Sequence, residues 1–250
     1  MNSSRPVALV TGSATGVGRA CILKLAEKGF DVIVNYSRSA SEAQKTVEAA
    51  EEFGGRVMIH CCDVANDRSV REMMGKIEET FGRLDVLINN AATTTFVDHG
   101  DLEGLTEAMW DRVLNVNLKG SFFCTRAAAD LLRAGDGGAV VNISSVAALT
   151  GKGSSIAYCA SKAGLNSVTL SLARVLAPQV RVNAVCPGPI NSRWIAEGNP
   201  DWDINQMVKD YPLPRASEPE DIADAALFFA LGTTMVTGQI LAVDGGMLLG

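Results

Sequence analysis

The chain has 250 residues, of which 47% are apolar and 20% charged, enough for one large α/β domain with a sizeable core. Its formal net charge of −6 argues against a nucleic acid or an anionic membrane as a partner, because neither surface attracts an acidic protein. Six cysteines are scattered without CxxC spacing, and only two histidines are present, which predicts reduced core thiols, no metal site and a cytoplasmic location.

Short apolar runs alternate with amphipathic stretches in the first half of the chain. The first run, within residues 6–11, is too short for a signal peptide or a membrane span. It and three similar runs are rich in Val and Ile, as is typical of strands buried on both faces of a parallel sheet; the other three lie at 31–36, 56–61 and 84–89. Helices are predicted between them, each ending near a glycine cap, at 18–29, 41–54 and 67–82.

The second half of the chain continues the alternation. Three more strands are predicted at 137–145, 180–188 and 238–246, and helices at 106–134, 154–177 and 218–231. No linker or internal repeat interrupts the pattern, so residues 1–250 are predicted to form a single domain. We expect an α/β fold with a Rossmann-type doubly wound parallel sheet of about seven strands and helices on both faces, which binds ligands beyond the carboxyl ends of its strands.

A glycine-rich turn, TGSATGVG at residues 11–18, follows the first predicted strand. Gly12, Gly16 and Gly18 would let the backbone turn tightly and approach a pyrophosphate, whose charge the amino terminus of the next helix favours. Glycine-rich turns are common, but this position in a βαβ unit favours a dinucleotide site over a plain turn.

The end of the second strand, VIVNYSRS, bears on which dinucleotide is bound. An acidic residue here usually holds the ribose hydroxyls of NAD, whereas a basic residue accommodates the 2′-phosphate of NADP. Asn35 and Tyr36 are not acidic, and Arg38 follows them. Ser37 and Arg38 are therefore predicted to hold the phosphate, with NADP(H) preferred; a solvated Arg38 with NAD as the cofactor is the alternative.

The stretch AYCASKAG places Tyr158 and Lys162 four positions apart, so on a helix both side chains share one face. Such a pair is by itself more often a surface contact than an active site. If the ammonium lay about 4 Å from the phenol, it would favour the phenolate by roughly 4 kcal/mol at an effective dielectric constant near 20. The pKa of Tyr158 would then fall, before desolvation opposes it, towards the range of a general acid or base.

The chain resembles the short-chain dehydrogenase/reductase family from end to end. The motifs that carry the resemblance occur in the family's order: TGSATGVG, CDVAND, NNAA, NVNLKGSFF, NISS, YCASK, CPGPI and GQILAVDGG. Two positions depart from the family pattern, because Ala92 stands where glycine is usual and Ser192 where threonine is usual.

The resemblance implies a metal-independent interconversion of a carbonyl and an alcohol by hydride transfer. Tyr158 would be the general acid/base, Lys162 would hold the nicotinamide ribose, Ser145 would bond the substrate oxygen, and Asn117 would hold a water that links Lys162 to solvent. Asp63 would lie on the adenine side. The residues expected to bind the cofactor are Gly12, Ser13, Thr15, Gly16, Val17, Gly18, Ser37, Arg38, Asp63, Val64, Asn90, Ala91, Tyr158, Lys162, Gly188 and Ile190.

The substrate is a small carbonyl compound or alcohol that the sequence leaves unnamed. The 3-oxoacyl-acyl-carrier-protein reductases are the nearest subgroup, although the segment 129–139 offers one arginine, Arg133, against two aspartates, which is little basic charge for an acidic carrier protein. Sugar, steroid and small-alcohol dehydrogenases stay open, as does a non-catalytic dinucleotide-binding sensor. A substrate lid is predicted at 189–215, and the pocket candidates are Thr94, Thr95, Phe96, Ala147, Leu149 and Trp194. The apolar helical segments 120–132 and 163–177 and the resemblance predict a homotetramer.

Overall fold

A seven-stranded parallel sheet with the strand order β3-β2-β1-β4-β5-β6-β7 organises the protein. The structure is a computed structural model that describes residues 5–135, 137–192 and 202–249. The strands are β1 (Val7–Val10), β2 (Asp31–Tyr36), β3 (Val57–Cys61), β4 (Val86–Asn89), β5 (Gly138–Ile143), β6 (Val180–Pro187) and β7 (Ile240–Val243). The order reverses between β2-β1 and β4, and this is the point where ligands of such sheets bind.

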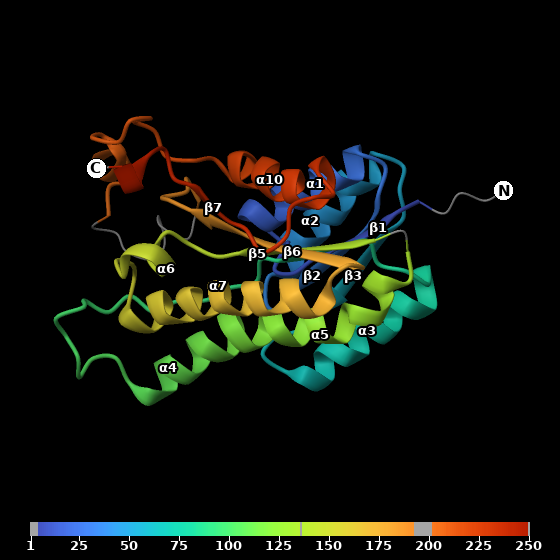
Figure 1. The fold of residues 1–250 in the computed structure, drawn as a ribbon, viewed down its shortest axis with the longest axis horizontal. Helices are drawn as coiled ribbons and strands as arrows, with labels where there is room; N and C mark the ends of the chain where they lie inside the picture. Colours follow the sequence, from blue (N-terminus) through green and yellow to red (C-terminus); the bar gives the residue numbers. More distant parts are fainter. Residues whose placement is uncertain (1–4, 136, 193–201, 250) are drawn as a thin grey trace.

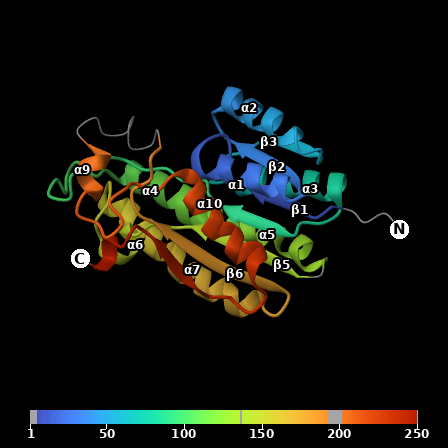
Figure 2. The same ribbon diagram turned by 90° about the horizontal axis from the view of Figure 1, so that it is seen from above.

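Helices cover both faces of the sheet (Figure 1). One face carries α1 (Gly16–Glu27), α2 (Ala40–Glu51) and α10 (Pro219–Leu227). The other carries α3 (Asp67–Phe81), α4 (Glu107–Leu114), α5 (Ser121–Arg133) and α7 (Ile156–Leu176). Seen from above, the sheet runs from β3 at one edge to β6 and β7 at the other (Figure 2). The predicted doubly wound α/β fold is confirmed.

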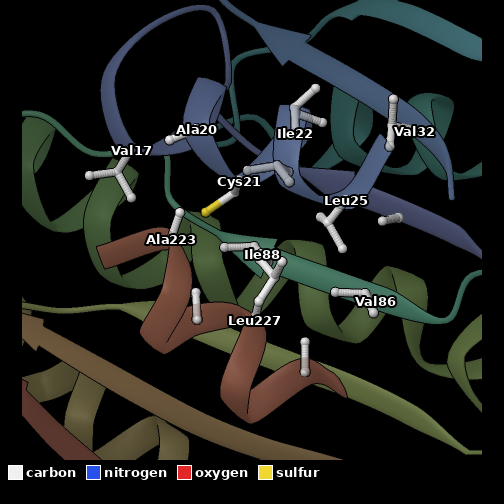
Figure 3. Packing of buried hydrophobic residues seen from close by; sticks show 14 of the residues in the cluster. Val17, Ala20, Cys21, Ile22, Leu25, Val32, Val86, Ile88, Ala223 and Leu227 are labelled. Carbon is white, nitrogen blue, oxygen red and sulfur yellow. The ribbon is translucent and has the colours of Figure 1, made fainter. Parts of the chain in front are cut away.

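The hydrophobic core is divided by the sheet, because successive residues of a strand point to opposite faces. Ala8 and Val10 of β1 join the cluster beneath α1 and α10, whereas Val7 and Leu9 join the cluster against α3, α5 and α7. Figure 3 shows the first cluster, in which α1 packs beside α10 over β4. This packing holds the amino terminus of α1 close to the carboxyl end of β1, which ends six residues earlier in the chain.

Two predicted helices are interrupted. The stretch 106–134 is divided into α4, a π-helical turn η1 (Asn115–Gly120) and α5, and the helix predicted at 218–231 ends in a second π-helical turn, η2 (Phe228–Gly232). Gly120 lies against the loop after β3, where a Cβ would meet Val64 Cγ2 at 2.7 Å. A π-turn carries one more residue than an α-turn and often occurs at functional sites.

The remaining short elements lie near the carboxyl ends of the strands: α6 (Ala147–Thr150), α9 (Ile204–Val208) and η3 (Met247–Leu249). The predicted lid is described in part, because residues 193–201, with Trp194, lie outside the described residues. Among the helices that are described, none is long and apolar enough to cross a membrane.

The cysteines are free, and five of the six are buried. Cys61 is exposed, which corrects the prediction that all six are core thiols. It is the last residue of β3, an edge strand whose residues are only partly covered. Burial of Cys21 under α10 raises the pKa of its thiol to about 12, so this thiol stays protonated at neutral pH.

Candidate active site

The glycine turn after β1 provides three different environments for its glycines. Gly12 has φ +62°, and a Cβ on it would lie 2.8 Å from Ala91 Cα. A Cβ on Gly18 would lie 2.6 Å from Asn90 Nδ2. Gly16, with φ +56°, faces open space, with nothing within 4 Å of a Cβ. A tight turn, an open backbone for phosphate approach and close helix packing are what a dinucleotide fingerprint requires, so the turn fits a bound pyrophosphate.

Side chains tie this turn to its neighbours. The Thr11 hydroxyl accepts hydrogen bonds from the backbone N–H groups of Asn90 and Ala91, both at 3.0 Å. Asn90 Nδ2 donates to the carbonyl oxygens of Thr11 and Gly12, at 2.9 and 3.0 Å. The loop after β4 is thereby held against the loop after β1.

Asn35, at the end of β2, ties the turn to the other side. Its Oδ1 accepts from Gly12 N at 3.0 Å, and its Nδ2 donates to Cys62 O at 3.1 Å. Sequence reasoning treated Asn35 only as a residue that is not acidic. Its buried amide joins the loops after β1 and β3, a connection that no local pattern reveals.

A cleft of about 1060 Å³ extends along the carboxyl ends of the strands from Arg38 and Asp63 to Tyr158 and Lys162. Most predicted cofactor residues line it, namely Gly12, Thr15, Gly16, Val17, Ser37, Arg38, Asp63, Val64, Asn90, Ala91, Tyr158, Lys162, Gly188 and Ile190. Trp202, Met207 and Tyr211, which belong to the predicted lid 189–215, also line the cleft, as do Arg112 and Met247, which sequence reasoning did not select.

Some predicted residues lie elsewhere. Ser13 is buried and turned into the fold, where its hydroxyl accepts from Asn35 N at 3.1 Å. Gly18 packs beneath Asn90 and does not line the cleft. Among the pocket candidates, Thr94, Phe96 and Ala147 line the cleft, whereas Thr95 and Leu149 do not. The Thr94 hydroxyl lies 2.5 Å from the Ser154 hydroxyl. This contact joins the loop after β4 to the loop before α7.

Ser145, Tyr158 and Lys162 meet at one end of the cleft. Tyr158 and Lys162 lie one turn apart on α7, whose first turn is capped by Ser155, and Ser145 follows β5. Lys162 is 3% exposed, and its Nζ donates to Ile143 O at 2.7 Å and lies 5.8 Å from the centre of the Tyr158 ring. The side chains of Ser145 and Tyr158 are hydrogen-bonded.

Burial sets the protonation of this pair. It raises the pKa of Tyr158 to about 12, with the hydrogen bond from Ser145 opposing, and it lowers the pKa of Lys162 to about 8. The expected fall in the Tyr158 pKa is therefore wrong for the arrangement seen here. Desolvation of the buried phenol is the largest effect on its pKa, and it outweighs the hydrogen bond from Ser145.

Asn117 lies in η1 and is fully buried. Its Oδ1 accepts from Thr93 N at 2.8 Å, and its Nδ2 donates to Thr93 O at 2.9 Å and to the Ser161 hydroxyl at 3.0 Å. Ser161 in turn donates to Tyr158 O at 2.7 Å. The side chain of Asn117 thus clamps the loop after β4 to α7. Its role in holding a water stays a prediction.

Comparisons with known proteins identify the family of the chain. A family model described as Enoyl-(Acyl carrier protein) reductase matches residues 12–248. The chain is 38% identical over 244 residues to a 3-oxoacyl-[acyl-carrier-protein] reductase FabG of Staphylococcus aureus, which covers 97% of this chain and 98% of the relative. It is also 38% identical over 247 residues to an L-rhamnose 1-dehydrogenase (NAD(P)(+)) of Sphingomonas sp., with 96% and 94% covered. A solved structure from Burkholderia xenovorans, assigned to the short-chain dehydrogenases/reductases, matches with a TM-score of 0.93 at 37% identity over 100% of both chains.

The fold and the cleft define an oxidoreductase that uses a nicotinamide dinucleotide. The family model covers nearly the whole chain, and two curated relatives are 38% identical to it over 94% and 98% of their own length. The chain belongs to the short-chain dehydrogenase/reductase family, which confirms the resemblance and the expectation of an enzyme.

Proposed function

We propose that the protein reduces a carbonyl to a secondary alcohol, with NADPH as the preferred cofactor and Tyr158 as the general acid. One observation carries this proposal: Ser145, Tyr158 and Lys162 converge in a cleft that the glycine turn also lines. When bound, the dinucleotide supplies the hydride. The protein supplies orientation, a proton and stabilisation of charge.

The protonation states suit reduction. Because the pKa of Tyr158 is raised to about 12, the phenol is protonated at neutral pH and can donate to a developing alkoxide. The phenolate that remains would be stabilised by the Ser145 hydroxyl and by Lys162, which is mostly charged at pH 7 because its pKa is about 8. The Ser145 hydroxyl would also bond the substrate oxygen.

Arg38 supports the preference for NADPH. It lines the cleft at the end of β2, beside Ser37 and without an acidic side chain at Asn35 or Tyr36. A guanidinium pairs well with a phosphate, and the end of β2 has no carboxylate that would repel that phosphate. NAD as the cofactor is the alternative.

The walls of the cleft bear on the substrate. Phe96 and Trp202 form an edge-to-face pair with ring centroids 5.4 Å apart, and Met207 and Met247 line the same cleft. These apolar groups favour a substrate with an apolar extension, such as a 3-oxoacyl thioester, over a sugar. The relatives do not separate these classes, since the chain is equally identical to an oxoacyl reductase and to a rhamnose dehydrogenase.

The test is NADPH oxidation at 340 nm against a panel of 3-oxoacyl thioesters, ketones, aldehydes and sugars. Tyr158→Phe removes the proton donor but keeps the ring, so turnover should fall by about 10²-fold or more while NADPH binding stays within a few fold. A variant that retained comparable turnover, or a wild type that EDTA inactivated, would refute the mechanism. The same panel with NADP⁺ and alcohols tests the sugar-dehydrogenase alternative.

A further inference from the structure

The order of the strands indicates where each part of a dinucleotide lies. The glycine turn at the end of β1 suits the pyrophosphate, and Arg38 at the end of β2 suits the phosphate on the adenosine ribose. The next strand outward is β3, and the residues after it that line the cleft are Cys62, Asp63 and Val64. If the cofactor is bound as proposed above, its base lies beside Asp63.

Two partners hold the Asp63 carboxylate. Oδ1 accepts from Ala65 N at 3.0 Å, and Oδ2 accepts from Arg112 Nη1 at 2.9 Å. The two side chains are 41% and 42% exposed, and both line the cleft. Burial alone would raise the pKa of Asp63, but the Ala65 N–H and the Arg112 guanidinium, with a smaller effect of Arg38, lower it below its usual range. The carboxylate is therefore ionised and can only accept hydrogen bonds.

The helix that carries Arg112 is itself anchored to the same loop. Arg112 lies on α4, and η1 follows directly, bringing Gly120 against Val64. The loop after β3 is thus held at two adjacent points from the α4–η1 segment, one polar and one by close packing. Such a double attachment restricts the directions in which Asp63 can turn.

We propose that Arg112 is a positioning residue for base recognition, which holds Asp63 as an ionised acceptor so that the cleft selects a 6-aminopurine over a 6-oxopurine. The exocyclic amine of adenine is a donor that a fixed carboxylate oxygen can accept. A 6-oxopurine presents a carbonyl oxygen at that position, which the carboxylate repels and cannot bond. A site built for a donor rejects strongly the analogue that lacks it.

The probes are NADPH and its analogue with hypoxanthine in place of adenine, which differ only at this edge of the base. Dissociation constants are measured from the fluorescence of the reduced nicotinamide. Wild type should bind NADPH at least about tenfold more tightly than the analogue. In Arg112→Met, the dissociation constant for NADPH should rise about fivefold while that for the analogue changes less than about twofold, so discrimination largely disappears. Arg112→Lys, which keeps the charge but loses the fork, should be intermediate.

A matched control is Arg126→Met. Arg126 of α5 forms an ion pair with Asp67 at the start of α3, a similar link between elements that does not line the cleft. This variant should keep the wild-type discrimination. Asp63→Asn should bring the ratio near one, since an amide can turn to donate or to accept. If Arg112→Met does not fold, Arg112→Lys and Asp63→Asn provide the same comparison.

The outcomes separate this inference from the proposed function. A wild type that binds neither dinucleotide refutes the proposed cofactor use. A wild type that binds both equally, or an Arg112→Met variant that weakens both by the same factor, overturns the role of Arg112 and leaves the cofactor assignment standing.

Discussion

Replacing Lys162 by methionine should reveal the cost of burying its charge. Burial lowers the pKa of Lys162 to about 8 from its ordinary value of 10.5. The folded-state pKa lies below the unfolded one, so between about pH 8 and pH 10.5 the unfolded chain binds a proton that the folded chain has released. The free energy of unfolding contributed by this group therefore rises with pH in that window and is flat below it.

The size of the effect follows from the two pKa values. Between pH 7 and pH 9 this one group should add about 1.4 kcal/mol to the wild-type free energy of unfolding. That is the change expected over one pH unit in which the unfolded chain binds one proton more than the folded chain. Tyr158 does not interfere, because its pKa of about 12 keeps it protonated in the folded state throughout this range. The hydrogen bond from Lys162 to Ile143 O is lost in the variant at every pH, so its loss changes the difference in unfolding free energy between the two proteins by the same amount at pH 7 and at pH 9.

The assay is urea denaturation of wild type and Lys162→Met at pH 7 and pH 9, at one protein concentration because oligomers complicate comparison. The difference in unfolding free energy between the two proteins should increase by about 1.4 kcal/mol at the higher pH. If the two proteins change equally with pH, Lys162 does not titrate in this range, and the account of its burial is wrong.

Three further outcomes are expected. Arg38→Ala should weaken NADPH binding by about tenfold to a hundredfold and barely affect NADH; equal loss for both would show that Arg38 supports the loop without contacting the phosphate. Gly12→Ala should destabilise the fold by about 1–3 kcal/mol more than Gly16→Ala, because both have positive φ but only Gly12 is crowded, with Ala91 Cα 2.8 Å from its Cβ position; equal melting shifts would contradict this packing. We also propose a homotetramer, in which exposed Phe122 on α5 and Leu170 and Val175 on α7 are covered by neighbouring subunits. Light scattering that shows a monomer at micromolar concentration would dismiss it.

The regular elements could be predicted because their signals are local. The run predicted at 31–36 coincides with β2, and the helix predicted at 67–82 is α3, whose last turn is capped by the N–H of Gly82. Apolar runs for strands, amphipathic stretches for helices and glycines after them are readable without knowledge of the neighbours. The π-turn η1 was not predicted, because it depends on close packing of Gly120 against a loop more than fifty residues away.

The site was predicted from motifs, but the directions of its side chains were not. Tyr158 and Lys162 line the cleft as expected, whereas Ser13, within the glycine turn, is turned towards Asn35. Asn117 was placed by its motif, yet its contacts with Thr93 and Ser161 come from a loop and a helix that meet only in the fold.

The sequence by itself determined the order of strands and helices, the position of the glycine turn and the identity of the groups that can donate a proton, because these depend on residue type and spacing. Only the tertiary structure decided how those groups behave. Burial sets the pKa of Tyr158 and of Lys162, and the partner of Asp63 is an arginine 49 positions away. Desolvation and pairing depend on what packs around a side chain, and distant segments of the chain supply that surrounding only once they fold together.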